Sequence, residues 1–163
     1  AALVRELPAA AVEALALSRG WSLSSSTSRS LWLKRQGLVL QCCWGQFATL
    51  LPAAQVVVSM AGTASEQAAG LGKPVLQLAG HGPQFTVGFA EAQRRLLGPA
   101  VHCAKGDVDD PNTLIESAEL LEQLLELPEA TLEQLREQGD QRLGQAGGTQ
   151  RMARAILERL QQP

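Results

Sequence analysis

Hydrophobic and polar positions in the first third of the chain change from helical to strand-like spacing. Pro8 suits the first turn of a helix, and Gly20 follows the apolar run as a stop signal. Further on, the run L-V-L-Q-C-C-W (38–44) is continuously apolar, which is typical of a strand buried on both faces. This part is therefore expected to hold a helix over 7–18, a strand over 31–34, a strand over 38–44 and a helix over 46–54.

The middle of the chain alternates between strand and helix patterns. Residues 55–60 (Q-V-V-V-S-M) form a β-branched run of strand length, and residues 74–78 (P-V-L-Q-L) form a second one. A helix is expected between them over 63–71, with Gly72 where a helix C-cap belongs. A strand, a helix and a strand at this spacing predict a right-handed βαβ unit with parallel strands.

The same alternation continues toward the C-terminus. A helix is expected over 84–97 and a short strand over 100–104, and helical patterns then cover 112–127, 129–143 and 149–161. Alternating strands and helices predict an α/β fold with a doubly wound, Rossmann-like parallel sheet and C-terminal helices. We expect residues 1–163 to form a single domain of this kind.

Composition narrows the class of protein. The chain has 163 residues, of which 45% are hydrophobic and 18% are charged, and this excludes a disordered tail. No apolar run reaches about 18 residues, and no signal-peptide pattern opens the chain. We interpret the three cysteines as buried thiols and expect a reducing, cytoplasmic location. The first residue is not Met, so we expect a part of a longer protein.

The net charge of −2 conceals an asymmetry along the chain. Residues 1–106 carry 9 Lys and Arg against 4 Asp and Glu, whereas residues 107–163 carry 5 against 12. The mildly basic first part suits an anionic small ligand, but its cations are too dilute for a nucleic-acid surface. Cys and His lack the spacing of a zinc site, and we expect neither a metal ion nor a cofactor.

Two loops are candidates for ligand binding, because doubly wound sheets bind ligands beyond the carboxyl ends of their strands. In the first loop, Gly62 and Thr63 open a helix, whose free amides and dipole attract anions. Thr63 is expected at the N-cap and forms a capping box with Glu66. These two residues could serve only to cap the helix. The second loop, 79–84, contains His81.

Three segments together resemble a known family. They are V-V-V-S-M-A-G-T-A-S-E-Q-A-A-G-L-G-K-P-V-L-Q-L (56–78), G-H-G-P-Q-F-T (80–86) and R-L-G-Q-A-G-G-T (142–149). They are similar to the C-terminal, donor-binding domain of GT-B glycosyltransferases. The resemblance is greatest to lipid-A-disaccharide synthase and its synthase-related relatives from photosynthetic bacteria. It covers residues 38–160 in the order of elements.

The resemblance implies a UDP-sugar as ligand, similar to UDP-GlcNAc. It implies that backbone amides bind the pyrophosphate, that a polar residue one turn later binds the ribose, and that the second loop contacts the sugar. The implied substrate-binding residues are Gly62, Thr63, Glu66, Gln67, His81 and Gln84. The ribose position falls on Gln67, where the family has an acidic residue. An amide cannot form the charge-assisted, bidentate hydrogen bonds that a carboxylate forms.

The chain also departs from the family in its domain organisation. GT-B enzymes have a second, N-terminal domain that carries the acceptor site and usually the catalytic base, so the catalytic residues here stay unknown. The helix over 149–161 would cross to that missing domain. Its apolar residues Met152, Ile156 and Leu160 would then lack a partner, which favours a homodimer. A full-length protein of this family could also contact a membrane peripherally.

Three functions are thus in competition. The leading hypothesis is the donor-nucleotide half of a glycosyltransferase of the lipid-A-disaccharide synthase type, inactive by itself. A UDP-GlcNAc 2-epimerase-like fragment would share the same donor loop. A non-catalytic nucleotide-binding or scaffold domain would need no further catalytic domain.

Overall fold

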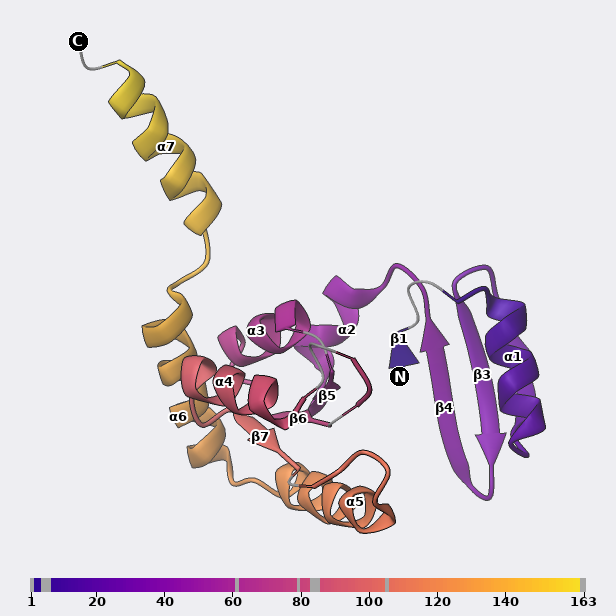
Figure 1. The fold of residues 1–163 in the computed structure, drawn as a ribbon. Coiled ribbons are helices and arrows are strands. Elements are labelled where there is room, and N and C mark those ends of the chain that lie inside the picture. The colour runs from indigo at the N-terminus through magenta and orange to yellow at the C-terminus, as the bar shows by residue number, and fades with distance from the viewer. Residues whose placement is uncertain are drawn as a thin grey trace. The chain divides into compact units, whose positions relative to one another are not determined.

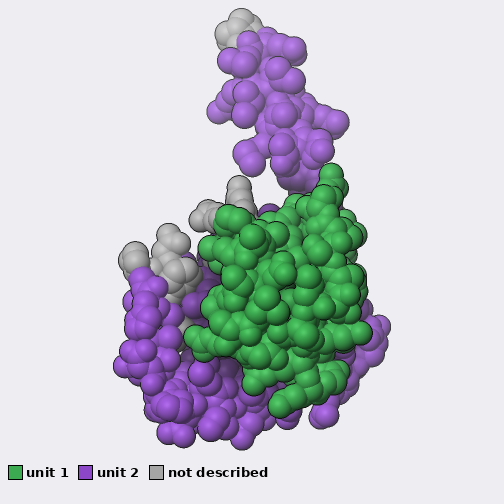
Figure 2. All heavy atoms as spheres, turned by 90° about the vertical axis from the view of Figure 1, so that its right-hand side faces the viewer, with its two compact units in different colours: residues 1–53 green, residues 54–163 purple. Residues whose placement is uncertain are grey.

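The computed structural model describes residues 2–3, 7–60, 62–78, 80–82, 86–104 and 106–161, with residues 2–3 described by their backbone alone. The chain divides into two compact units, residues 1–53 and residues 54–163 (Figure 2). We had expected one α/β domain over 1–163. The parallel sheet on which that expectation rested belongs to the second unit alone.

Unit 1 contains a four-stranded sheet in the order β1-β4-β3-β2. Its strands are β1 (Ala2–Leu3), β2 (Ser22–Ser26), β3 (Ser30–Arg35) and β4 (Leu38–Cys43). β1 pairs with β4 in parallel, and the other two pairings are antiparallel. Helix α1 (Ala9–Ser18) lies along this sheet (Figure 1).

The core of unit 1 lies between α1 and the sheet. Val12 and Ala16 of α1 pack with Leu31 and Leu33 of β3 and with Cys42 of β4. Three partly buried side chains complete this cluster, namely Trp21, Leu40 and Trp44. The inward residues of β3 therefore alternate with outward ones, as in a sheet with one covered face.

The prediction that 38–44 is a strand buried on both faces is wrong. The strand exists as β4, but Leu38 is 63% exposed and Val39 is 57% exposed. These residues follow the β3–β4 turn, where Gln36 and Gly37 both have positive φ, as a tight hairpin turn requires. β4 thus continues an antiparallel hairpin, and an apolar run alone does not distinguish this arrangement from a central parallel strand.

Unit 2 contains a three-stranded parallel sheet in the order β5-β6-β7. The strands are β5 (Val57–Ser59), β6 (Val75–Gln77) and β7 (Val101–Cys103). Helix α3 (Gly62–Gly70) connects β5 to β6, and α4 (Val87–Leu97) connects β6 to β7. The α/β class and the parallel pairing are confirmed. A doubly wound sheet reverses its strand order once, and the three described strands do not include such a reversal.

The remaining helices lie close to their predicted ranges. They are α2 (Phe47–Ala53), α5 (Pro111–Leu125), α6 (Glu129–Leu143) and α7 (Gly148–Leu160). α6 matches its prediction residue for residue. α7 buries none of its side chains among the described residues, so the predicted stripe of Met152, Ile156 and Leu160 is exposed. None of the described helices is both long enough and apolar enough to cross a bilayer.

The C-terminal end of α3 has the expected glycine cap. Gly72 has a φ of +66°, its N–H donates to the Ala69 carbonyl at 3.0 Å, and the Lys73 N–H donates to the Ala68 carbonyl at 3.0 Å. This pair of bonds is a Schellman motif. A Cβ on Gly72 would lie 2.6 Å from the Arg136 Cα, so α6 approaches this turn at backbone distance.

Arg142 of α6 caps the C-terminal end of α4. Its Nη1 donates to the carbonyls of Arg95 at 3.3 Å and Leu96 at 3.1 Å. Carbonyls in the last turn of a helix have no intrahelical donor, so the guanidinium supplies one. Replacing Arg142 by Met is expected to lower the free energy of unfolding by about 1 kcal/mol in chemical denaturation. The control Arg154→Met, on exposed α7, is expected to change it by less than about 0.5 kcal/mol. Equal losses in the two variants would contradict the capping role.

Candidate functional site

The candidate site lies at the carboxyl edge of the parallel sheet of unit 2. Because β5, β6 and β7 run in parallel, the segments that follow them leave from the same edge. This is the edge at which open α/β sheets bind ligands. Residues 61, 79, 83–85 and 105 of these segments lie outside the described residues, and the predicted site residue Gln84 is among them.

The first turn of α3 differs from its prediction in register. The helix begins at Gly62, so Thr63 is already inside the first turn. The prediction that Thr63 occupies the N-cap and forms a capping box with Glu66 is therefore wrong. The prediction that this helix follows β5 directly is confirmed, since β5 ends at Ser59. The free amides of the first turn thus lie at the carboxyl edge of the sheet.

The two sides of α3 have different environments. Ser65, Ala68 and Ala69 are buried, whereas Thr63 and Gln67 are exposed. Thr63 and Gln67 are four residues apart, so they share one face of the helix. Their side chains and the first-turn amides are thus accessible to a ligand that runs from the end of the helix along its exposed face. Glu66 is also exposed, one position before Gln67.

His81 follows β6 and lies within hydrogen-bond distance of Asp109, which follows β7. The His81 Nε2 and the Asp109 Oδ1 are 3.2 Å apart, and both side chains are 76% exposed. An exposed pair of this kind contributes little to stability, about 0–1 kcal/mol. The contact shows that the loops after these two adjacent strands lie next to each other. Asp109 is not among the site residues predicted from the sequence.

A group of buried and partly buried polar side chains lies beneath this edge. We call Ser65, Gln77, Gln93 and Cys103 the amide cluster. Gln77, the last residue of β6, is 3% exposed, and its Nε2 donates to the Ser65 Oγ at 3.1 Å and to the Gln93 Oε1. The Cys103 Sγ donates to the Gln77 Oε1 at 3.8 Å. Burial, and then the charge of Glu91, raise the pKa of the Cys103 thiol, which favours its protonated, donor form.

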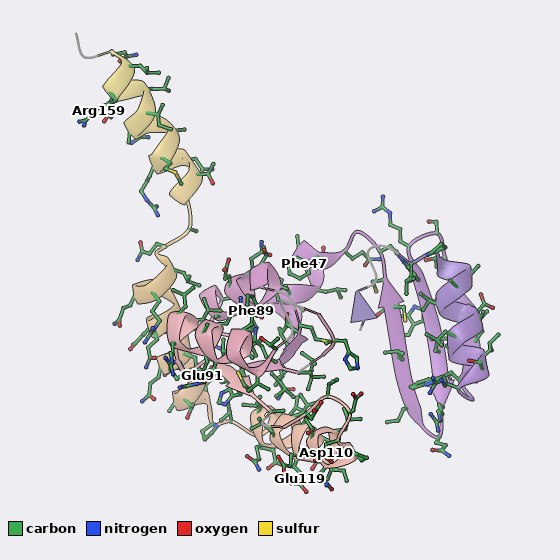
Figure 3. The ribbon with its side chains drawn as sticks, in the orientation of Figure 1. Phe47, Phe89, Glu91, Asp110, Glu119 and Arg159 are labelled. Carbon is green, nitrogen blue, oxygen red and sulfur yellow. The ribbon has the colours of Figure 1, made fainter. Side chains whose placement is uncertain are left out.

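The amide cluster reaches the first turn of α3 through Gln93. A Cβ built on Gly62 would lie 2.8 Å from the Gln93 Nε2 and 3.9 Å from the Phe89 Cζ. Figure 3 shows Phe89 on α4, the helix that also carries Gln93. A side chain at position 62 would therefore require this amide, the end of the Gln93 side chain, to move. The sequence analysis missed Gln77 and Gln93, although a glutamine inside the apolar run P-V-L-Q-L was a visible signal.

On the outer face of α4, Arg94 and Arg95 both pair with Glu91. Hydrogen bonds from Arg94, and then from Arg95, hold the pKa of the Glu91 carboxyl at about 2. Figure 3 labels this glutamate on α4. Among the residues that the structure describes, no group of three or more His, Cys, Asp and Glu could hold a metal ion. The polar groups described at this edge are the first-turn amides of α3 and the exposed side chains of Thr63, Gln67 and His81, with the amide cluster beneath them.

A shallow depression of about 520 Å³ lies in unit 1. Lys34, Arg35 and the residues of the β3–β4 turn line it. It contains none of the predicted site residues, so it does not change the assignment of the candidate site to unit 2.

Comparisons with known proteins add no assignment to this geometry. No protein-family model, no curated protein and no solved structure matched the chain.

Proposed function

We propose that unit 2 binds the diphosphate of a UDP-sugar at the first turn of α3. The chain would then be the donor-nucleotide half of a cytoplasmic GT-B glycosyltransferase of the lipid-A-disaccharide synthase type, inactive by itself. The observation that carries this proposal is that α3 begins at Gly62, directly after β5, at the carboxyl edge of a parallel sheet. The Gln93 amide lies close to that position, 2.8 Å from where a Cβ would be.

The physical argument starts from the helix end. The first amides of a helix have no intrahelical acceptor, and the helix dipole adds about half a positive charge there. A phosphate accepts hydrogen bonds from these amides and interacts favourably with the positive end of the dipole. Gly62 lets the phosphate approach the backbone closely. Gln67 lies one turn further along the same exposed face as Thr63, where a ribose attached to the diphosphate would lie. His81, Glu66 and Gln84 would complete the set of substrate-binding residues.

This arrangement would act on the leaving group in a transfer reaction. Negative charge accumulates on the departing UDP, and the preorganised amides and dipole of α3 would stabilise it. Such a site requires no metal ion. The acceptor and the catalytic base would belong to a second, N-terminal domain. The proposal also includes a homodimer formed through α7, which the exposed apolar stripe of this helix supports. Peripheral membrane contact would belong to the full-length protein.

The test is to titrate the chain with UDP, UDP-GlcNAc and ADP while recording backbone amide NMR shifts. We expect shifts confined to Gly62, Thr63 and 80–82, larger for UDP than for ADP. No shifts at millimolar UDP would contradict the proposal. Equal shifts with UDP and ADP would favour the scaffold alternative. Binding of UDP-GlcNAc followed by release of an epimerised sugar would favour the epimerase-like alternative.

Two substitutions at one position test the backbone contact itself. Thr63→Pro removes one first-turn N–H, and proline is tolerated in the first turn of a helix, here after a glycine that has no Cβ to clash. Thr63→Ala keeps the N–H and removes only the side chain. We expect Thr63→Pro to weaken UDP binding about tenfold, as loss of a hydrogen bond to a charged group predicts. A similar loss in both variants would contradict backbone recognition.

A further inference from the structure

Gln77 and Gln93 lie where the core would favour apolar side chains. Gln77 follows Val75 and Leu76 in the central strand of the sheet, and the exposed fractions of Gln77 and Gln93 are 3% and 7%. Burying an amide costs free energy unless its polar atoms are hydrogen-bonded. Leu or Met would fill the same volume without that requirement. Packing alone therefore does not explain the side-chain amides of Gln77 and Gln93.

The hydrogen bonds of the amide cluster determine how each amide is oriented. The Gln77 Nε2 donates to both the Ser65 Oγ and the Gln93 Oε1, while its Oε1 accepts from the Cys103 thiol. Because the Gln93 Oε1 faces a donor, the Gln93 Nε2 must be on the other side of that amide. This is the atom that lies 2.8 Å from the position of a Cβ on Gly62. A donor edge thus faces the first turn of α3.

A donor edge at this place is complementary to an anion. The amide N–H groups carry partial positive charge, in the same sense as the first-turn amides of α3. A carboxylate in the same position would repel a phosphate across a short distance in a buried setting, where charges interact strongly. The neutral amide at position 93 therefore suits an anionic ligand, and Gln77 determines which edge that amide presents.

We infer that Gln77 and Gln93 are positioning residues of the candidate anion site. Gln93 determines the position of Gly62 and places the partial positive charge of its amide N–H groups behind the site. Gln77 determines the orientation of the Gln93 amide. The role toward a ligand rests on the proposed function. The role toward the backbone does not, because it concerns the position of Gly62 in the ligand-free chain. The two roles can therefore be tested separately.

The first arm of the test uses no ligand. Gln93→Met keeps the volume and removes the amide, and the control Ala92→Met adds the same side chain at the neighbouring, exposed position of α4. We expect the amide resonances of Gly62 and Thr63 to shift in Gln93→Met and to stay in place in Ala92→Met. Gln77→Met is expected to shift the same resonances as Gln93→Met. Unmoved resonances in both glutamine variants would overturn the positioning role.

The second arm measures the dissociation constant for UDP. Gln93→Glu places a carboxylate behind the site, and Ala92→Glu adds the same charge on the exposed side of the same helix. We expect Gln93→Glu to weaken UDP binding at least about tenfold more than Ala92→Glu, and Gln93→Met to fall between them. Equal affinities of the two Glu variants would overturn the role in anion binding. A wild-type chain that binds no UDP would instead overturn the proposed function, and the ligand-free arm would still decide the positioning role.

Discussion

Gly139→Ala is expected to lower the free energy of unfolding of unit 2 by about 3 kcal/mol, the upper part of the range for overpacked sites. A Cβ on Gly139 of α6 would lie 2.5 Å from the carbonyl oxygen of Ala69 and 3.3 Å from that of Gly70. Both neighbours are backbone atoms of α3, so no side-chain rotation relieves the contact. The helices would have to separate, and the packing of Gly72 on Arg136 at the same crossing would separate with them.

The matched control is the same substitution in another helix. A Cβ on Gly88 of α4 would meet nothing closer than the Thr86 Oγ1 at 3.9 Å. Gly88→Ala is therefore expected to raise the stability by about 0.5–1 kcal/mol, because alanine loses less conformational freedom on folding. Urea denaturation followed by circular dichroism measures both variants. A cost below about 0.5 kcal/mol for Gly139→Ala would mean that α3 and α6 do not touch through their backbones.

The elements of unit 2 could be predicted because their signals are local. α6 begins after Pro128 and ends before Gly144, which are ordinary helix boundary residues, and its predicted range matches the structure. Gly72 was predicted as a C-cap and has the positive φ that this position requires. Start and stop signals of this kind act within a few residues, so a single sequence displays them.

The parallel pairing of β5 with β6 could be predicted from the strand–helix–strand pattern, but the antiparallel sheet of unit 1 could not. The run 38–44 was expected in the α/β sheet, but Leu38–Cys43 pairs with Ser30–Arg35 in an antiparallel sheet of its own unit. An apolar run does not specify its pairing partner. Gly37 is a local turn signal between the two strands, but a turn signal does not by itself show that the flanking strands pair.

The local features of the candidate site could be predicted from the sequence, and its long-range contacts could not. Gly62 and Thr63 were identified because a helix start is a local feature, and the structure places them at the carboxyl edge of the sheet. The bond between Gln77 and Gln93 spans 16 positions, and the pair of His81 and Asp109 spans 28. The first contact forms only when α4 packs against β6, and the second only when β6 and β7 lie side by side, so periodicity and caps could not reveal them.

Leu33→Ala is expected to unfold unit 1 and to leave the helical signal of unit 2 in place. Leu33 is fully buried, and the buried side chains with which it clusters all belong to residues 1–53. Truncating a buried leucine costs about 2–5 kcal/mol. A unit of this size buries a smaller fraction of its surface than a larger domain does, and it has little stability to lose. The cost therefore approaches the whole stability of unit 1.

The distribution of tryptophan makes this measurable in the intact chain. All three tryptophans, Trp21, Trp32 and Trp44, belong to unit 1, so tryptophan fluorescence reports that unit alone. Far-UV circular dichroism is dominated by the helices of unit 2. In urea, Leu33→Ala should move the fluorescence transition to lower concentration and leave the dichroism transition nearly unchanged. Leu38→Ala, at a 63% exposed position of the same hairpin, should move neither. If both transitions moved together in Leu33→Ala, the two units would have to unfold as one.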